Sequence, residues 1–293
     1  HVEDCLSKNE KRKIFTNIKA LAISKVCGIV SSGTDNIIIS KLFGLVQVGL
    51  VSNYLMVINS VNNIFYNALT SMSAGIGNFN VDSSVSEKRK IFDELLHAVY
   101  LVYSSVCVCL AVLMKPFIII WLGEEYLISS LILLSLVFSI YISGINYCVY
   151  VFRTTEGYFK EVQYIYVFSA VVNIILSIIL GEILGVAGVF IATCASKIFI
   201  TEISDSYFTY VKILDRKHGS YFLKYILFLF ICIINLLICA SIVNFITFNG
   251  WIGLIFKGIV CASTNILTNI ILFYKTKEFK SLLKRYLGLI KRR

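Results

Sequence analysis

Charge, proline and histidine are scarce in this sequence. Of its 293 residues, 15% are charged, one is proline and three are histidine, whereas 58% are apolar. A soluble globular chain carries about 25% charged residues, so this composition indicates a membrane protein. The single proline and the long apolar runs favour helices over an outer-membrane barrel, whose strands alternate in polarity over about 10 residues.

Motifs for metal binding and for catalysis are also missing from the sequence. The nine cysteines form no CxxC pair, and no histidine lies near the CxC of Cys107 and Cys109, so free thiols acting as small apolar side chains are favoured. There is no nucleophile elbow, phosphate loop or metal-ligand spacing. We therefore expect no enzyme, no metal site and no cofactor.

Eight stretches are long and apolar enough to cross a bilayer, which takes about 20 residues. They cover residues 17–40, 48–75, 95–120, 127–152, 162–182, 185–207, 222–247 and 250–274. No linker rich in serine, glycine or proline separates them. The sequence thus predicts an all-α polytopic membrane helix bundle, with residues 17–274 as one transmembrane domain.

Basic residues occupy alternate connections between these stretches. They cluster in 1–16, 88–90, 153–160, 212–224 and 275–293, while the other connections carry almost none. Positive charge in short loops marks the cytoplasmic side. We expect both termini to be cytoplasmic, with 1–16 as an N-terminal cytoplasmic segment.

The basic tail, 275–293, has the pattern of an amphipathic helix. Its apolar residues recur at helical spacing: Phe279, Leu282, Leu283, Tyr286, Leu287 and Ile290. Lysines and arginines lie between them, which is typical of a helix on anionic lipid. Membrane lipids are therefore an expected partner, and nucleic acid is not, since no module would present the tail to it.

An acid lies within the first predicted span. Asp35 shares one helical face with Ser24, Gly28 and Ser31. An acid that exchanges a proton or holds a cation inside a membrane is a natural ion-coupling group of a transporter. The alternative is that Asp35 only caps a turn near the outer end of its helix. Lys25 lies about 15 Å nearer the cytoplasm.

The second predicted span carries a polar stripe at helical spacing. Its members are Ser52, Asn59, Asn63, Tyr66, Asn67 and Thr70. Amides donate and accept hydrogen bonds, which suits sugar hydroxyls or phosphate oxygens. Asn59, Asn63 and Asn67 are therefore candidates for lining a hydrated cavity. Interhelical hydrogen bonds, each worth about 1 kcal/mol or less, are the equal alternative.

Two further lysines lie inside predicted spans. Lys197 is near mid-span, where it could attract an anionic group such as a pyrophosphate, or form a salt bridge with an acid such as Asp35. Lys257 lies closer to the outer end and is expected to snorkel. Glu202 and Asp205 lie toward the cytoplasmic end of their span, where we expect them to be solvated.

Several segments resemble bacterial polysaccharide (oligosaccharide) flippases of the multidrug/oligosaccharidyl-lipid/polysaccharide exporter superfamily. They are SSGTDNIIISKLFGLVQVGLVSNY (31–54), SMSAGIGN (71–78), FIIIWLGEEYL (117–127), FRTTEGYFKEV (152–162) and GVAGVFIATCASKI (185–198). Together they cover most of residues 14–210, while 222–274 is similar only in hydropathy. Their order and spacing carry more weight than any one segment.

The resemblance implies two lobes of six helices, with two more in some members, around a central cavity with alternating access. The chain would be the second lobe plus two helices, and since it begins with His1 we expect it to lack the start of a longer protein. The implied substrate is a polyprenyl-pyrophosphate-linked oligosaccharide, flipped across a bacterial plasma membrane for surface polysaccharide synthesis. Glycosyltransferases and a polysaccharide polymerase are the implied protein partners.

The flippase hypothesis gives roles to the polar residues of the spans. Lys25 and Lys197 would attract the pyrophosphate, Asn59, Asn63 and Asn67 would line the sugar path, and Asp35 would couple transport to an ion. The similar lipid II flippases use arginines in the matching cavity helices, where this chain offers only Lys25. Two alternatives stay open: a drug/cation antiporter of the same superfamily, and an inactive fragment or scaffold for glycosyltransferases.

Overall fold

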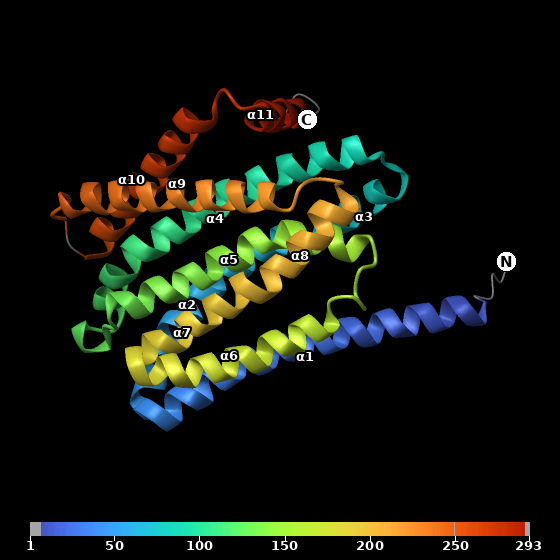
Figure 1. Cartoon of the computed structure of the whole chain (residues 1–293). Coiled ribbons are helices and arrows are strands. Elements are labelled where there is room, and N and C mark those ends of the chain that lie inside the picture. The colour runs from blue at the N-terminus through green and yellow to red at the C-terminus, as the bar shows by residue number, and fades with distance from the viewer. Residues whose placement is uncertain (1–6, 249, 291–293) are drawn as a thin grey trace, which may run out of the picture.

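The structure, a computed structural model, describes residues 7–248 and 250–290, and this part of the chain consists of helices joined by short connections (Figure 1). The α-helices are α1 (Lys8–Phe43), α2 (Leu45–Thr70), α3 (Ser73–Asp82), α4 (Val85–Trp121), α5 (Ser130–Thr155), α6 (Gln163–Leu184), α7 (Val186–Ser196), α8 (Ile203–Tyr207), α9 (Gly219–Asn244), α10 (Gly250–Phe273) and α11 (Lys277–Ile290). A 3₁₀ turn, η1 (Glu124–Tyr126), precedes α5, and two π-helical segments, η2 (Lys197–Glu202) and η3 (Phe208–Ile213), flank α8.

Within this described part, seven helices are long and apolar enough to cross a membrane. They are α1, α4, α5, α6, α9, α10 and the run Val186–Ile213. This confirms the predicted all-α polytopic bundle. The remaining predicted span, 48–75, is not one continuous helix, because α2 ends at Thr70, Ser71 and Met72 form a turn, and α3 begins at Ser73. Five asparagines lower the mean hydropathy of α2, and it is not among the seven.

Two capping boxes lengthen helices beyond the predicted spans. Ser7 accepts a hydrogen bond from the Glu10 backbone while Glu10 reaches back to the Ser7 N–H, so α1 begins in the polar segment. Ser84 and Glu87 do the same for α4, which begins ten residues before the predicted start at 95. Such a box satisfies free N–H groups at a helix start, and it allows helix to form before the apolar run begins.

The basic segments gather at one end of the bundle. Figure 1 shows the start of α1 and the α3–α4, α5–α6 and α8–α9 connections at the same end. Lys88 pairs with Glu156 at 2.5 Å, and Arg89 pairs with Asp215 at 3.2 Å. These two ion pairs therefore link the basic segments 88–90, 153–160 and 212–224 to one another.

Asp93 forms a further junction at that end. Its carboxylate pairs with Arg216 at 2.6 Å and with Lys224 at 2.8 Å, which connects α4 to the start of α9. The hydrogen bonds that Arg216 donates to Asp93 raise the pKa of Arg216. The hydroxyl of Ser281 donates to Glu94 at 2.6 Å, so α11 lies against α4.

The helices pack in three groups, and the cavity described below lies on the side of α5 away from α9 and α10. α1 lies along α6, α5 lies between α4 and α7, and α9 and α10 cover the other side of α4 (Figure 1). The largest fully buried side chains include Tyr100 and Tyr103 of α4 and Tyr141 and Phe152 of α5. The core is therefore centred on the α4–α5 pair, and α1 and α2 lie at its edge.

The closest approach of α4 and α5 depends on Gly144. A Cβ at this position would lie 2.2 Å from a ring carbon of Tyr103. We expect Gly144→Ala to destabilise the protein by about 1–3 kcal/mol, because the ring must leave its packed position. Thermal unfolding of the purified protein in detergent measures this, with Gly75→Ala, which meets nothing within 4 Å, as the control. Equal stability of the two variants would contradict the prediction.

Candidate functional site

A cavity of about 850 Å³ lies among α1, α2, α5, α6 and the α7–η2 helix. Three of the residues predicted from the sequence, Asp35, Asn59 and Lys197, line it. The other three do not: Lys25, Asn63 and Asn67 have exposed side chains on α1 and α2 and lie outside its lining. Asn62, which the sequence reasoning did not select, lines it and accepts a hydrogen bond from Tyr103.

Asp35 belongs to a buried polar cluster at the junction of α1, α6 and α7. Its side chain is 5% exposed, and Oδ2 accepts a hydrogen bond from Thr193 Oγ1 at 3.0 Å. Thr193 Oγ1 in turn accepts from Asn173 Nδ2 at 3.0 Å. The second oxygen of Asp35, the amide oxygen of Asn173 and the hydroxyl of Ser177 are buried without a hydrogen-bond partner.

These unsatisfied oxygens define the chemistry of the cluster. A buried carboxylate without a cation is costly in a membrane interior. Carboxylate, amide and hydroxyl oxygens are the ligands that hard cations prefer. The free oxygens of Asp35 and Asn173 are therefore acceptors open to a proton donor or a small cation.

Lys197 occupies the α5 side of the same cavity. Its Nζ donates to Ser139 Oγ at 2.9 Å and to Ser143 Oγ at 3.0 Å. Across the described part of the chain no ion pair joins Lys197 to Asp35, so the alternative of a salt bridge between them is not formed. An ammonium held by two hydroxyls has a third N–H donor left for an anionic group.

Asp205 is buried, which corrects the expectation that it is solvated. It is 0% exposed, and its Oδ1 pairs with Arg153 Nε at 2.9 Å, while Tyr166 OH donates to Oδ2 at 2.6 Å. Arg153 was expected in a loop but lies in the last turn of α5 and is 2% exposed. Arg153 faces into the bundle because α5 extends past the predicted span, whereas Asp205 lies inside its predicted span and faces Arg153 and Tyr166.

Glu202 was also expected to be solvated, and it is buried as well. It is 1% exposed, and its carboxylate accepts hydrogen bonds from Tyr221 of α9 and Asn146 of α5. Glu202 also lines the cavity. The π-helical turn η2 carries Lys197 at its first residue and Glu202 at its last, and π turns inside α-helices occur frequently at functional sites.

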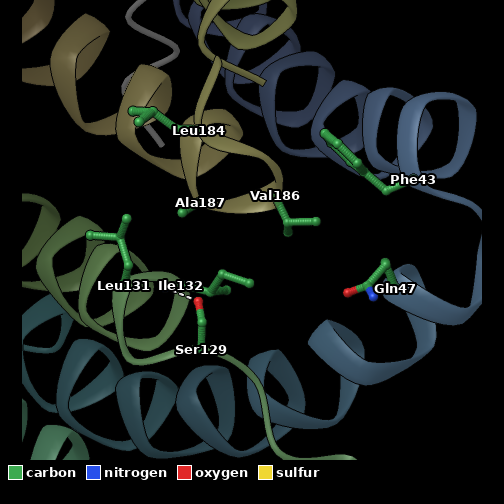
Figure 2. A pocket seen from close by; sticks show the side chains of 8 residues that line it. All are labelled: Phe43, Gln47, Ser129, Leu131, Ile132, Leu184, Val186 and Ala187. Carbon is green, nitrogen blue, oxygen red and sulfur yellow. Dashed lines mark hydrogen bonds between the residues drawn. The ribbon is translucent and has the colours of Figure 1, made fainter. Parts of the chain in front are cut away.

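A smaller cavity of about 320 Å³ lies where the α1–α2, η1–α5 and α6–α7 turns meet (Figure 2). Gln47 and Ser129 are its polar lining residues, and Ser129 Oγ accepts from the Ile132 N–H at the start of α5. None of its eight lining residues is charged. The larger cavity is therefore the candidate site.

Comparison with known proteins found no matching family model, no matching curated protein and no matching solved structure.

Proposed function

We propose that the chain belongs to a flippase that moves polyprenyl-pyrophosphate-linked oligosaccharides across a bacterial plasma membrane for surface polysaccharide synthesis. One observation carries the proposal: a cavity inside an apolar helix bundle holds a lysine fixed by two serines beside a wall of amides. Lys197 would contact the diphosphate, and Asn59, Asn62 and Asn146 would contact sugar hydroxyls. An amphipathic substrate needs this combination of apolar surroundings and polar lining.

The exposed polar groups on α1 and α2 support a partner lobe beside them, which would be the first lobe of the proposed transporter. Lys25, Asn63 and Asn67 are exposed on α1 and α2. Polar groups at membrane depth require protein or water beside them. In this proposal they face the other lobe across a shared cavity, and Lys25 adds positive charge to the entrance. The basic end of the bundle would be cytoplasmic, which supports entry of the substrate from that side.

The Asp35 cluster would couple transport to an ion. Its unpartnered carboxylate oxygen lies in the same cavity as Lys197. Binding of a cation there would change the charge that the substrate meets. The same observation supports the second candidate, a drug/cation antiporter, which cation-driven dye efflux without any lipid-linked sugar would favour.

Lys197→Met tests the leading proposal. We expect translocation of the lipid-linked oligosaccharide to fall about tenfold, because a hydrogen bond to a charged group is worth about 1.5–3 kcal/mol. The assay measures appearance of the oligosaccharide on the far face of membrane vesicles from cells that express the full-length gene product. Lys257→Met removes a lysine of α10 that does not line the cavity and is the matched control.

Two outcomes would contradict the proposal. One is that the unaltered protein moves no lipid-linked oligosaccharide in vesicles where it is present at normal abundance. The other is that Lys197→Met supports the same flux as Lys257→Met at equal abundance. A loss confined to Lys197→Met supports the assignment of the cavity.

A further inference from the structure

Four tyrosines line the cavity: Tyr66, Tyr147, Tyr150 and Tyr166. They come from the last turns of α2 and α5 and the first turn of α6, so they lie toward the basic end of the bundle. The ring of Tyr66 is 41% exposed and meets the ring of Tyr147 edge to face, with 6.0 Å between centroids. An exposed ring on a cavity wall offers a surface to a ligand rather than filling the core.

Neighbouring groups hold most of these rings in place. Tyr147 OH donates to the Leu69 carbonyl at 2.7 Å. The guanidinium of Arg153 lies 5.4 Å from the ring centre of Tyr150 and 5.8 Å from that of Tyr166. Since Asp205 pairs with Arg153, this cation has a partner and is not free for a diphosphate. Tyr147, Tyr150 and Tyr166 are therefore held by neighbouring groups, and of the two cations Lys197 is the one available to an anionic ligand.

The residues of α5 that face the cavity follow one another along the helix. Ser139 and Ser143 hold Lys197, and Asn146, Tyr147 and Tyr150 follow on the same face. From Ser143 to Tyr150 the helix rises about 10 Å toward the basic end. A diphosphate at Lys197 would thus place the sugars attached to it beside the amide and the tyrosines.

The chemistry of a sugar ring fits this wall. A pyranose has an apolar face of C–H groups and a rim of hydroxyls. An aromatic ring covers the apolar face through dispersion and its quadrupole, and amides bond to the hydroxyl rim. We propose that Tyr66, Tyr147 and Tyr150 form a platform for the sugar rings next to the diphosphate, with Asn146 at the hydroxyls. This inference rests on the proposed function and assigns the sugar-binding part of its site.

The test compares two probes on the protein in lipid nanodiscs. One is farnesyl diphosphate, and the other is farnesyl diphosphate bearing one N-acetylglucosamine. We expect the second to bind the unaltered protein more tightly, and Tyr66→Leu to raise its Kd about tenfold, or about 1.4 kcal/mol. Tyr66→Phe keeps the ring and should retain the affinity, while neither variant should change binding of the sugar-free probe.

The outcomes separate this inference from the proposed function. If both probes bind but Tyr66→Leu and Tyr150→Leu bind the sugar probe as the unaltered protein does, the platform is overturned and the diphosphate site stands. If the sugar adds no affinity, the platform is likewise overturned. If the unaltered protein binds neither probe, the proposed substrate is wrong and the platform falls with it.

Discussion

Replacing Arg153 by methionine is expected to destabilise the protein by about 3–5 kcal/mol, because it leaves Asp205 as a buried charge without its partner. Arg153 is 2% exposed and Asp205 is 0% exposed, so water cannot take over the role of the guanidinium. Tyr166 donates one hydrogen bond to Asp205, which is insufficient for a carboxylate in the bundle interior. Thermal unfolding in detergent and the amount of protein in the membrane measure the effect.

The double variant Arg153→Met/Asp205→Leu provides the decisive comparison. Replacing a buried ion pair by apolar side chains is often neutral or stabilising, so the double variant should recover most of the lost stability. Lys88→Met is the matched control, because its pair with Glu156 is partly exposed and should contribute under about 1 kcal/mol. If Arg153→Met is no more harmful than Lys88→Met, the buried pair does not stabilise the bundle as argued.

The sequence was sufficient for the architecture because membrane insertion constrains it strongly. In lipid, the backbone N–H and C=O groups must form hydrogen bonds within the protein, so a long apolar run folds as a regular α-helix. The ends of helices are different: capping boxes at Ser7 and Ser84 and the extension of α5 past residue 152 depend on polar residues that a hydropathy window reads as loop. Arg153 was misplaced for that reason, whereas Asp205 lies within the predicted span 185–207 and is buried by its tertiary contacts with Arg153 and Tyr166.

The candidate site could be found only in part from the sequence. Asp35 and Lys197 stand out as charges in apolar runs, and both line the cavity. The hydrogen-bond partner of Asp35 is Thr193 of α7, 158 residues away, and Thr193 in turn accepts from Asn173 of α6, so no local pattern pairs them. Yet Asn173 and Ser177 lie one turn apart on one face of α6, and that spacing could have indicated a polar face toward Asp35.

Asp35→Asn is expected to have opposite effects on stability and on transport. The change removes a charge that is buried with one oxygen unpartnered, so the folded protein should become more stable by about 1–3 kcal/mol. Such gains at a functional group usually cost activity. We expect transport to fall about 100-fold, near the upper limit of a coupling free energy between two sites.

The response to an imposed cation gradient distinguishes coupling from a merely structural role. Flux in the unaltered protein should rise when a sodium or proton gradient is imposed, and Asp35→Asn should remove that response. Thr193→Val, which deletes the hydroxyl that donates to Asp35, should weaken the response without abolishing it, since the carboxylate remains. Glu182→Gln removes an exposed acid of α6 outside the cavity lining and should leave the response intact. Because Asn has nearly the shape of Asp, a variant that is stable, abundant and still gradient-driven would show that the charge of Asp35 does not couple transport to an ion. A stable variant without the response would assign the coupling to this carboxylate, since no loss of folding could then explain the loss of flux.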